Sequence, residues 1–382
     1  MNMKSYLVVG CGFYGAVFAR VLAEHGYKVN LIDKRNHIAG NCFTKTVDNI
    51  PVHMYGPHAF HTNSFDVWSF LNRFCDFNDF KLQIKVSHKH NIYSFPINLF
   101  TLNQLYGVSN PAEAKKILNK LKKPMKAKNF ESYIVSNLGP DIYSIFFEGY
   151  TRKQWNINPS ELSDSVAKRI PIRFDYNDYY FNDKYQGIPI GGYTKLFENM
   201  LDHKNIQIDL NCDFFSNRKE LEKGFKKIIY SGKIDELLDY KHGLLEYRSL
   251  KFETKKFAKT FQGNSIINYT ENNVPYTRIV EHKYFAQINQ EKTIITYEYP
   301  DDYDGKKIPF YPMPTDKNKQ TYQKYKSDAE KLDKYVIGGR LGRYVYLNMD
   351  QVIAMALKDS EVELWKNKKK LKKYNLTKTF TN

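Results

Sequence analysis

Three glycines near the start of the chain have the spacing of a turn that binds phosphate. Gly10, Gly12 and Gly15 follow an apolar run at residues 6–9 and precede a stretch with helical spacing that ends at Gly26. Gly10 permits a tight turn, Gly12 lets the backbone approach a pyrophosphate, and Gly15 lets the helix pack closely on the strand. The helix N-terminus offers N–H groups and partial positive charge to the anion. The turn therefore predicts a dinucleotide-binding site.

An acidic residue and a loop extend this site. Asp33 closes a second apolar segment at residues 28–32, where its carboxylate can accept a hydrogen bond from a ribose 2′-hydroxyl. The glycine spacing alone does not separate FAD from NAD. The loop at residues 34–41 contains small and polar side chains and resembles the loop that covers the cofactor in flavoproteins. This loop favours FAD.

Arginine is scarce in a chain that is strongly basic. The formal net charge is +17 and the pI is about 9.3, yet most of the 58 basic residues are lysines dispersed along the chain. The charge by itself admits a nucleic acid, an anionic membrane surface or a polyanionic small substrate. Because the planar guanidinium suits phosphate better than an ammonium does, the few arginines are the more informative candidates. The sequence shows no nucleic-acid-binding motif, so we expect no such partner.

Composition and cysteine spacing exclude several other classes. The 382 residues are 42% hydrophobic and 15% aromatic, which excludes a disordered or fibrous chain and allows two or three domains. No apolar run is long enough to cross a bilayer, and no signal-peptide pattern is present, so we expect a cytoplasmic protein. The four cysteines lack zinc-ligand spacing, which predicts reduced thiols and no metal site.

Two later segments repeat the form of the first strand. Residues 227–232 and 335–340 each predict a buried strand that ends in glycine, as in nucleotide-binding sheets, and a helix is expected at 350–357. The predicted fold class is α/β, with a Rossmann-like FAD-binding domain, a helical insertion and an antiparallel-sheet substrate domain. The FAD-binding domain is expected to be discontinuous and to comprise residues 1–80, 196–240 and 330–382.

Helical signals dominate the middle of the chain. Asn110 precedes a proline in the pattern of a helix N-cap, and Gly149 is expected to end a helix over 141–148. These signals predict a helical domain at residues 97–164.

Alternation of polar and apolar residues follows the helical segment. It predicts strands at 265–269, 279–288 and 293–299. The substrate domain is expected to comprise residues 81–96, 165–195 and 241–329.

Several stretches closely resemble one enzyme family. They are residues 55–62, 149–155, 169–174, 185–196, 245–250, 275–279 and 338–341. Along nearly its whole length, the lysine-rich end excepted, the chain resembles bacterial UDP-galactopyranose mutase. The resemblance implies a flavin-dependent isomerase that interconverts UDP-galactopyranose and UDP-galactofuranose by attack of N5 of reduced FAD on the anomeric carbon, with no net redox change. It also implies a UDP-sugar substrate, a role in cell-surface polysaccharide synthesis and a homodimer.

The resemblance implies roles for three catalytic candidates. Arg173 and Arg278 match two arginines that bind the diphosphate, where fixed guanidinium groups stabilise the charge that develops as UDP leaves. Arg173 lies in residues 166–176, which correspond to a mobile loop of the family, so we expect substrate to close this lid. His61 matches a histidine near flavin and sugar that has a positioning role, and proton transfer by it is a hypothesis.

Further site residues are implied by the same resemblance. The substrate-binding candidates are mostly aromatic or polar: Phe146, Phe147, Tyr150, Thr151, Gln154, Trp155, Tyr185, Arg248, Asn268, Tyr311 and Tyr346. The cofactor-binding candidates are Gly10, Gly12, Tyr14, Gly15, Asp33, Lys34, Asn41, His58, Arg340, Met349 and Gln351. By spacing alone, the aromatic residues between 146 and 155 form an apolar helix face that is typical of a core.

Some features leave the substrate and the partners open. Asn348 stands where the family usually has an aspartate, and Leu82 where an amide is expected, so a related sugar such as UDP-N-acetylgalactosamine or another altered hexose is an alternative. A flavin amine oxidase or desaturase is a second alternative, and a nucleic-acid-binding protein a third. The lysine-rich segment 366–373 predicts a solvated end, with weak attachment to an anionic membrane surface as the alternative.

Overall fold

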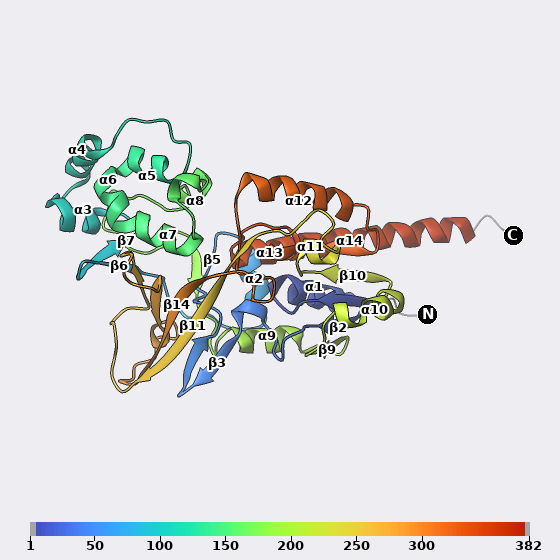
Figure 1. Cartoon of the computed structure of the whole chain (residues 1–382). Helices are drawn as coiled ribbons and strands as arrows, with labels where there is room; N and C mark the ends of the chain where they lie inside the picture. Colours follow the sequence, from blue (N-terminus) through green and yellow to red (C-terminus); the bar gives the residue numbers. More distant parts are fainter. Residues whose placement is uncertain (1–4, 379–382) are drawn as a thin grey trace.

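The computed structural model describes residues 5–378, with side chains up to residue 366. A five-stranded parallel sheet forms one half of the molecule (Figure 1). Its strands are, from edge to edge, β16 (Tyr335–Ile337), β10 (Lys227–Tyr230), β1 (Ser5–Val9), β2 (Lys28–Ile32) and β9 (Ile206–Asp209). The two late segments with a strand followed by glycine therefore join the N-terminal unit in one sheet, as predicted.

Two long helices pack against this sheet and against each other. Helix α1 (Phe13–Glu24) buries ten residues, and α14 (Met349–Lys378) lies alongside it and then continues beyond the sheet (Figure 1). The apolar strands are covered by helices, which explains their continuous apolar runs. Helix α14 extends well past the helix predicted at 350–357. The side chains of most of the lysine-rich segment 366–373 lie outside the described residues, so its attachment to a membrane stays a prediction.

A seven-stranded sheet forms the other half. Its strands are, in order, β15 (Tyr311–Pro312), β11 (Tyr247–Phe257), β14 (Thr293–Asp302), β13 (Arg278–Glu281), β12 (Ile266–Tyr269), β6 (Ile84–His88) and β7 (Asn91–Phe95). All neighbours are antiparallel except β12 and β6, which pair in parallel. The expected antiparallel sheet is thus present with one parallel pair.

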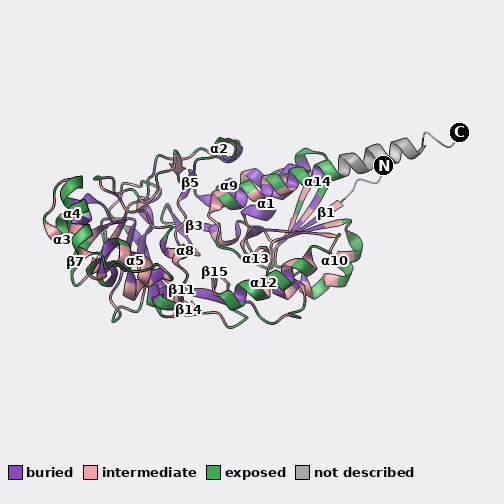
Figure 2. Cartoon of the chain, turned by 90° about the horizontal axis from the view of Figure 1, so that it is seen from above, coloured by how far each residue is buried: buried purple, intermediate pink, exposed green. Residues whose placement is uncertain are grey.

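A group of helices packs at one end of this sheet and forms the helical insertion (Figure 1). The helices are α3 (Leu99–Tyr106), α4 (Pro111–Leu121), α5 (Phe130–Leu138), α6 (Pro140–Ile142), α7 (Gly149–Trp155) and α8 (Asp164–Ala167), with a π-helical turn at Tyr143–Glu148. The Asn110 side chain accepts from Glu113 N (3.0 Å), which confirms the predicted cap. Figure 2 shows exposed residues on the outer faces of these helices and buried residues along the strands.

Gly149 does not end a helix, and this prediction was wrong. The chain passes through the π-helical turn directly into α7, and Gly149 has helical angles (φ −67°, ψ −38°). A Cβ at this position would lie 2.0 Å from the carbonyl oxygen of Thr270. The glycine is therefore required for the close approach of α7 to the loop after β12.

The strand predicted at 279–288 is also shorter than expected. The chain leaves the sheet after Glu281 and forms a 3-10 turn at His282–Tyr284, which buries His282 beside His53. The remaining elements are β3 (Thr44–Val47), β4 (Ile50–His53), β5 (Phe60–Thr62), α2 (Phe65–Asn72), β8 (Tyr185–Gly187), α9 (Tyr193–Leu201), α10 (Arg218–Gly224), α11 (Ile234–Leu237), α12 (Asp316–Ala329) and α13 (Gly339–Gly342), with short 3-10 turns at Gly40–Cys42, Pro159–Glu161 and Phe215–Asn217.

The predicted fold class is confirmed by these layers, whereas the exact domain boundaries stay a prediction. In the described part of the chain, no helix has both the length and the apolar character needed to span a membrane.

Candidate active site

A cleft of about 800 Å³ takes its lining from both sheets. The glycine turn and the loop after β2 line one part of it, and Arg278, Tyr311 and Tyr346 line another. Predicted cofactor-binding, substrate-binding and catalytic residues that line it are Gly10, Gly12, Tyr14, Asp33, Lys34, Asn41, His58, His61, Arg278, Tyr311, Arg340, Tyr346 and Met349.

The glycine turn has the geometry that its spacing predicts. Gly10 has a φ of +99°, which favours glycine, and a Cβ on Gly15 would lie 2.0 Å from the Gly10 carbonyl oxygen. Gly12 is the N-cap of α1 and supplies no side-chain cap, so the first-turn N–H groups remain available to an anion. The Asp33 carboxylate accepts from Cys11 N (2.8 Å) and from Arg35 N (2.9 Å), which fixes the acidic group beside the turn.

The loop after β2 adds a residue that sequence reasoning missed. Arg35 donates to Asn41 Oδ1 (2.8 Å), and its guanidinium lies 4.7 Å from the centre of the Tyr55 ring. Arg35 and Tyr55 both line the cleft beside Lys34. The scarcity of arginine was the available signal, because this one lies two residues after the acidic residue of the motif.

Two other cofactor candidates in the cleft, Tyr14 and Met349, are held by contacts that involve α14. The Tyr14 hydroxyl donates to Asp359 Oδ2 (2.8 Å), and Cys42 Sγ lies 3.8 Å from Met349 Sδ. Gln351, by contrast, does not line the cleft: its side chain accepts from Asn348 N (2.9 Å) at the start of α14.

Two histidines in the cleft are held in fixed orientations. Burial lowers the pKa of His58 to about 4, so this imidazole is neutral near pH 7 and its Nδ1 donates to the Gly56 carbonyl (2.8 Å). His61 Nδ1 lies 2.7 Å from Asp183 Oδ2, and the His61 ring stacks on Phe181 with centroids 3.5 Å apart. The geometry thus supports a positioning role for His61, and proton transfer stays a hypothesis.

Arg278 is held in the cleft by two side chains. Its Nε lies 3.3 Å from Glu298 Oε1, and its Nη2 donates to the Tyr150 hydroxyl. Burial opposes the charge of Arg278, but the Glu298 carboxylate raises the pKa of the guanidinium above its usual value. Burial raises the pKa of Glu298, and Arg278 opposes that shift. Glu298 was missed by sequence reasoning, although a lone charged residue within an apolar strand was a usable signal.

Two tyrosines and two further arginines gather near Arg278. The Arg340 guanidinium lies 4.5 Å from the Tyr346 ring centre and 5.8 Å from that of Tyr311. Arg169, also missed from the sequence, lies 4.2 Å from the Tyr346 ring centre. The Trp155 ring is 6.2 Å from Tyr311. Arg340, Tyr311 and Tyr346 line the cleft, whereas Arg169 and Trp155 lie behind them, so this part of the cleft presents cationic and hydroxyl groups.

Buried amides near this cluster lack partners. Gln154 is 6% exposed, and neither its amide oxygen nor its nitrogen has a hydrogen-bond partner. Asn268 lies opposite Arg278 on the neighbouring strand, and its side-chain oxygen also has no hydrogen-bond partner. Arg248 donates to the backbone carbonyl of Gln154 (3.0 Å) and forms an ion pair with Asp302. Since buried polar groups are normally satisfied, the free amides indicate a place for a polar ligand.

The other substrate candidates do not line the cleft, and these include Tyr150, Gln154, Trp155, Arg248 and Asn268. Phe146 and Phe147 are buried in the core of the helical domain, where their spacing alone places them, and Thr151 is buried on α7. Tyr185 stacks on Trp68 with ring centroids 5.4 Å apart. Their contact with substrate stays a prediction.

Arg173 is buried and does not line the cleft. Its guanidinium donates to Asn182 Oδ1 (2.8 Å), to the Tyr180 carbonyl (3.2 Å) and to the Tyr179 carbonyl. These contacts hold the arginine against the segment 179–182, which follows its loop. Arg173 must exchange them if it is to reach a diphosphate, so its catalytic role stays a prediction.

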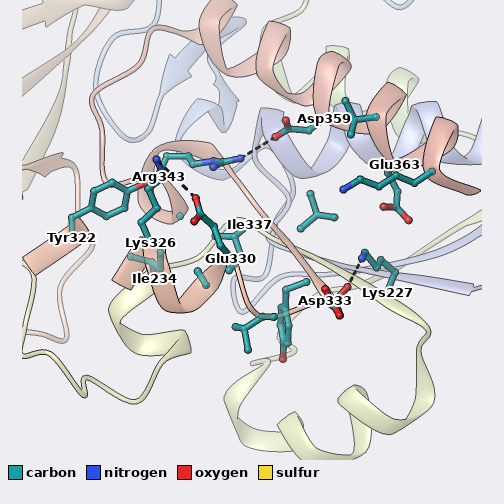
Figure 3. Close-up of a pocket in the computed structure, with 17 residues that line it drawn as sticks. Lys227, Ile234, Tyr322, Lys326, Glu330, Asp333, Ile337, Arg343, Asp359 and Glu363 are labelled. Carbon is teal, nitrogen blue, oxygen red and sulfur yellow. Dashed lines mark hydrogen bonds and ion pairs between the residues drawn. The ribbon is translucent and has the colours of Figure 1, made fainter. Parts of the chain in front are cut away.

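A second, smaller cavity of about 310 Å³ lies beside α12 and α14 (Figure 3). Its charged groups face one another: Arg343 Nη2 lies 3.7 Å from Asp359 Oδ2, and Lys326 Nζ lies 4.0 Å from Glu330 Oε1. These pairs balance charge within the chain, so we assign this cavity no ligand.

Comparisons with known proteins agree with this geometry. A family model described as UDP-galactopyranose mutase matches residues 145–346, and one described as an NAD(P)-binding Rossmann-like domain matches residues 8–74. The chain is 40% identical over 368 residues to a probable UDP-galactopyranose mutase of Klebsiella pneumoniae, covering 94% of this chain and 95% of the relative. It is 39% identical over 382 residues to a dTDP-fucopyranose mutase of Escherichia coli, covering 96% and 100% respectively. A solved structure of a reduced UDP-galactopyranose mutase has a similar fold, with a TM-score of 0.72 at 14% identity and coverage of 95% and 96%.

The fold and the cleft define an enzyme with a Rossmann-like dinucleotide-binding half and a cationic substrate half. The chain belongs to the UDP-galactopyranose mutase family, an isomerase family. The family that the sequence resembled is thereby confirmed.

Proposed function

We propose that this protein interconverts UDP-galactopyranose and UDP-galactofuranose with FAD as its cofactor, active in the reduced form. One observation carries the proposal: a single cleft joins the glycine turn to the cluster of Arg278, Glu298 and Tyr311. A dinucleotide in the turn and a nucleoside diphosphate at Arg278 would share this cleft. The homodimer and the cytoplasmic location belong to the same proposal.

The residues of the turn suit FAD. The N–H groups at the start of α1 have no side-chain cap and can hold a pyrophosphate, while Asp33 is placed to accept from a ribose hydroxyl. A Cβ on Gly12 would meet no atom within 4 Å, so space beside the turn is open. Reduced FAD, when bound, supplies an electron-rich nitrogen as the nucleophile for the anomeric carbon.

The substrate half provides charge and orientation. Arg278 is fixed by Glu298 and Tyr150, so its guanidinium needs little rearrangement to stabilise the negative charge that develops on the departing UDP. Arg340 lies nearby as a second cation, and the free amide of Gln154 can hydrogen-bond a base. We propose that closure of the loop at 166–176 brings Arg173 to the same diphosphate.

A 6-deoxy sugar is a second candidate substrate. Leu82, Ile84 and Ile266 line the cleft with apolar side chains, and Leu82 replaces an expected amide. The relative from Escherichia coli is named for a dTDP-fucopyranose, whose sugar carries a methyl group where galactose carries a hydroxymethyl group. An apolar wall would accept that methyl group without leaving a hydroxyl unpaired.

The experiment incubates dithionite-reduced protein separately with UDP-galactose, dTDP-fucose and UDP-N-acetylgalactosamine, and then separates pyranose and furanose forms by chromatography. We expect conversion of UDP-galactose without consumption of an electron acceptor. Faster conversion of dTDP-fucose would move the assignment to the second candidate. A colourless protein, no conversion of any sugar, or net oxidation of a substrate would overturn the proposed mutase. The last result would favour an amine oxidase or desaturase.

A further inference from the structure

Lys153 on α7 inserts its ammonium group into the loop between β12 and β13. The Lys153 Nζ lies 2.8 Å from the carbonyl oxygen of Tyr269, 2.9 Å from those of Glu271 and Val274, and 3.0 Å from that of Tyr276. An ammonium has three protons, so four carbonyl oxygens surround it much as they would surround a bound cation. A lysine that only solubilises a helix makes no such set of contacts.

The loop depends on this cation for its shape. Its own backbone bonds within this stretch run from Tyr269 N to the Thr277 carbonyl (2.9 Å) and from Val274 N to the Glu271 carbonyl (3.3 Å). Four carbonyl dipoles that converge on one point repel each other unless a positive charge lies between them. Without the ammonium, these carbonyls lose their hydrogen-bond donor, which water would have to replace.

The same loop leads directly into the diphosphate site. Thr277 is fully buried and its N–H donates to the Glu298 carbonyl (2.9 Å), and the next residue is Arg278. Tyr150, one turn before Lys153 on α7, accepts from Arg278 Nη2. Helix α7 and strand β13 are therefore joined twice, once through the loop and once through the arginine.

We propose that Lys153 is a positioning residue of the diphosphate site, which holds the loop after β12 and thereby aims Arg278 and Tyr150 at the substrate. Lys153 does not line the cleft, so it acts through Arg278 and touches no reacting group. The inference rests on the proposed function and adds to it a residue that sets the geometry of the arginine.

The first test replaces Lys153 with methionine, which keeps an unbranched side chain and removes the charge. We expect Lys153→Met to lower kcat for the UDP-sugar by about tenfold and to weaken UDP binding by a similar factor, equal to ~1.4 kcal/mol. The matched control is Lys195→Met on α9, which removes an exposed lysine that lies 3.7 Å from Glu198. This control should stay within about twofold of wild type in both measurements.

A double-mutant cycle separates positioning from general stability. In an Arg278→Ala background, Lys153→Met should weaken UDP binding by less than about twofold, because the arginine that it aims is absent. An equal loss in both backgrounds would overturn the inference, as would wild-type kinetics in Lys153→Met. If wild-type protein binds no UDP, the proposed function fails as well; if it binds UDP and the cycle is additive, this inference alone fails.

A pH titration of UDP binding tests the same point even if Lys153→Met does not fold. Burial lowers the pKa of Lys153 to about 8, and Glu271 opposes this shift. Burial moves three neighbouring groups away from this range: it raises the pKa of Tyr269 to about 12, raises that of Tyr276 and lowers that of His88. The affinity of the wild-type protein for UDP should fall as the pH rises through about 8, because the neutral amine of Lys153 holds the carbonyls less well than the ammonium does. A flat wild-type profile from pH 7 to 9, or the same fall in a folded Lys153→Met, would overturn the inference.

Discussion

The two ends of the cleft are built in different ways. At the glycine turn, one continuous segment from residue 6 to residue 41 supplies the backbone N–H groups, the acidic residue and the covering loop. At the other end, Arg278 comes from β13, Glu298 from β14, Tyr150 from α7 and Tyr311 from β15. The first end is a local backbone device, whereas the second exists only when distant elements pack together.

This difference predicts how each end responds to change. Ligand binding at a backbone site depends mainly on free space beside the backbone, so a single added methyl group can weaken it. A side-chain cluster is altered by loss of a charge, because its charged members stabilise one another in an environment that excludes water. Substitutions at the two ends should therefore affect different steps, cofactor retention at one and turnover at the other.

The largest expected effect is at the arginine. Arg278→Ala removes a fixed, half-buried cation held by Glu298, so we expect kcat to fall by about 10² to 10³-fold while flavin retention stays unchanged. Turnover of UDP-galactose under dithionite measures the first, and the flavin absorbance of the purified protein measures the second. Arg218→Ala on α10, which breaks a surface pair with Glu222, is the control. A kcat within about threefold of wild type, or ~0.7 kcal/mol, would remove Arg278 from the mechanism.

Arg173 tests whether the side-chain end of the cleft also recruits a residue that lies outside the cleft. If closure of its loop brings it to the diphosphate, Arg173→Ala should lower kcat by about 10- to 100-fold at saturating substrate. The variant should also melt at a lower temperature, because the Tyr180 carbonyl and Asn182 lose their donor. A lower melting temperature with kcat within about twofold of wild type would assign Arg173 to loop structure alone.

A substitution in the glycine turn should weaken flavin binding. Gly12 has a φ of −81° and a Cβ there meets no atom within 4 Å, so Gly12→Ala should leave the melting temperature of the apoprotein unchanged. The added methyl group would occupy the approach of the pyrophosphate, and flavin affinity should fall about tenfold, or ~1.4 kcal/mol. Gly224→Ala on α10, also in open space, is the matched control. Unchanged flavin affinity would show that the cofactor does not lie over this turn.

The same contrast explains what could be predicted from the sequence. The glycine turn, Asp33 and the parallel strands at 227–230 and 335–337 carry their signals within a few residues. Glu298 is a lone charged residue in an apolar strand, but only the placement of β14 beside Arg278 shows that its carboxylate faces the arginine. Gly149 was misassigned as a helix end because its reason, the approach of the Thr270 carbonyl, lies far away in the sequence. Family resemblance supplied Arg278 and the tyrosines, because spacing alone did not distinguish the arginine from a surface residue or the tyrosines from half-buried structural ones.

The smallest effect tests whether the free amide of Gln154 meets a base. In the structure, both amide atoms are buried without a partner, so a ligand that pairs them gains the hydrogen bonds without displacing others. Gln154→Ala should therefore weaken UDP binding by about 3- to 10-fold, or ~0.7–1.4 kcal/mol, and leave kcat at saturating substrate near wild type. Calorimetric titration with UDP, and with inorganic pyrophosphate as a ligand that lacks the base, measures the effect, and Gln207→Ala on the exposed side of β9 is the control. Equal weakening of UDP and pyrophosphate binding would place Gln154 near the diphosphate and contradict the assignment, because a contact to the base affects only the ligand that carries one.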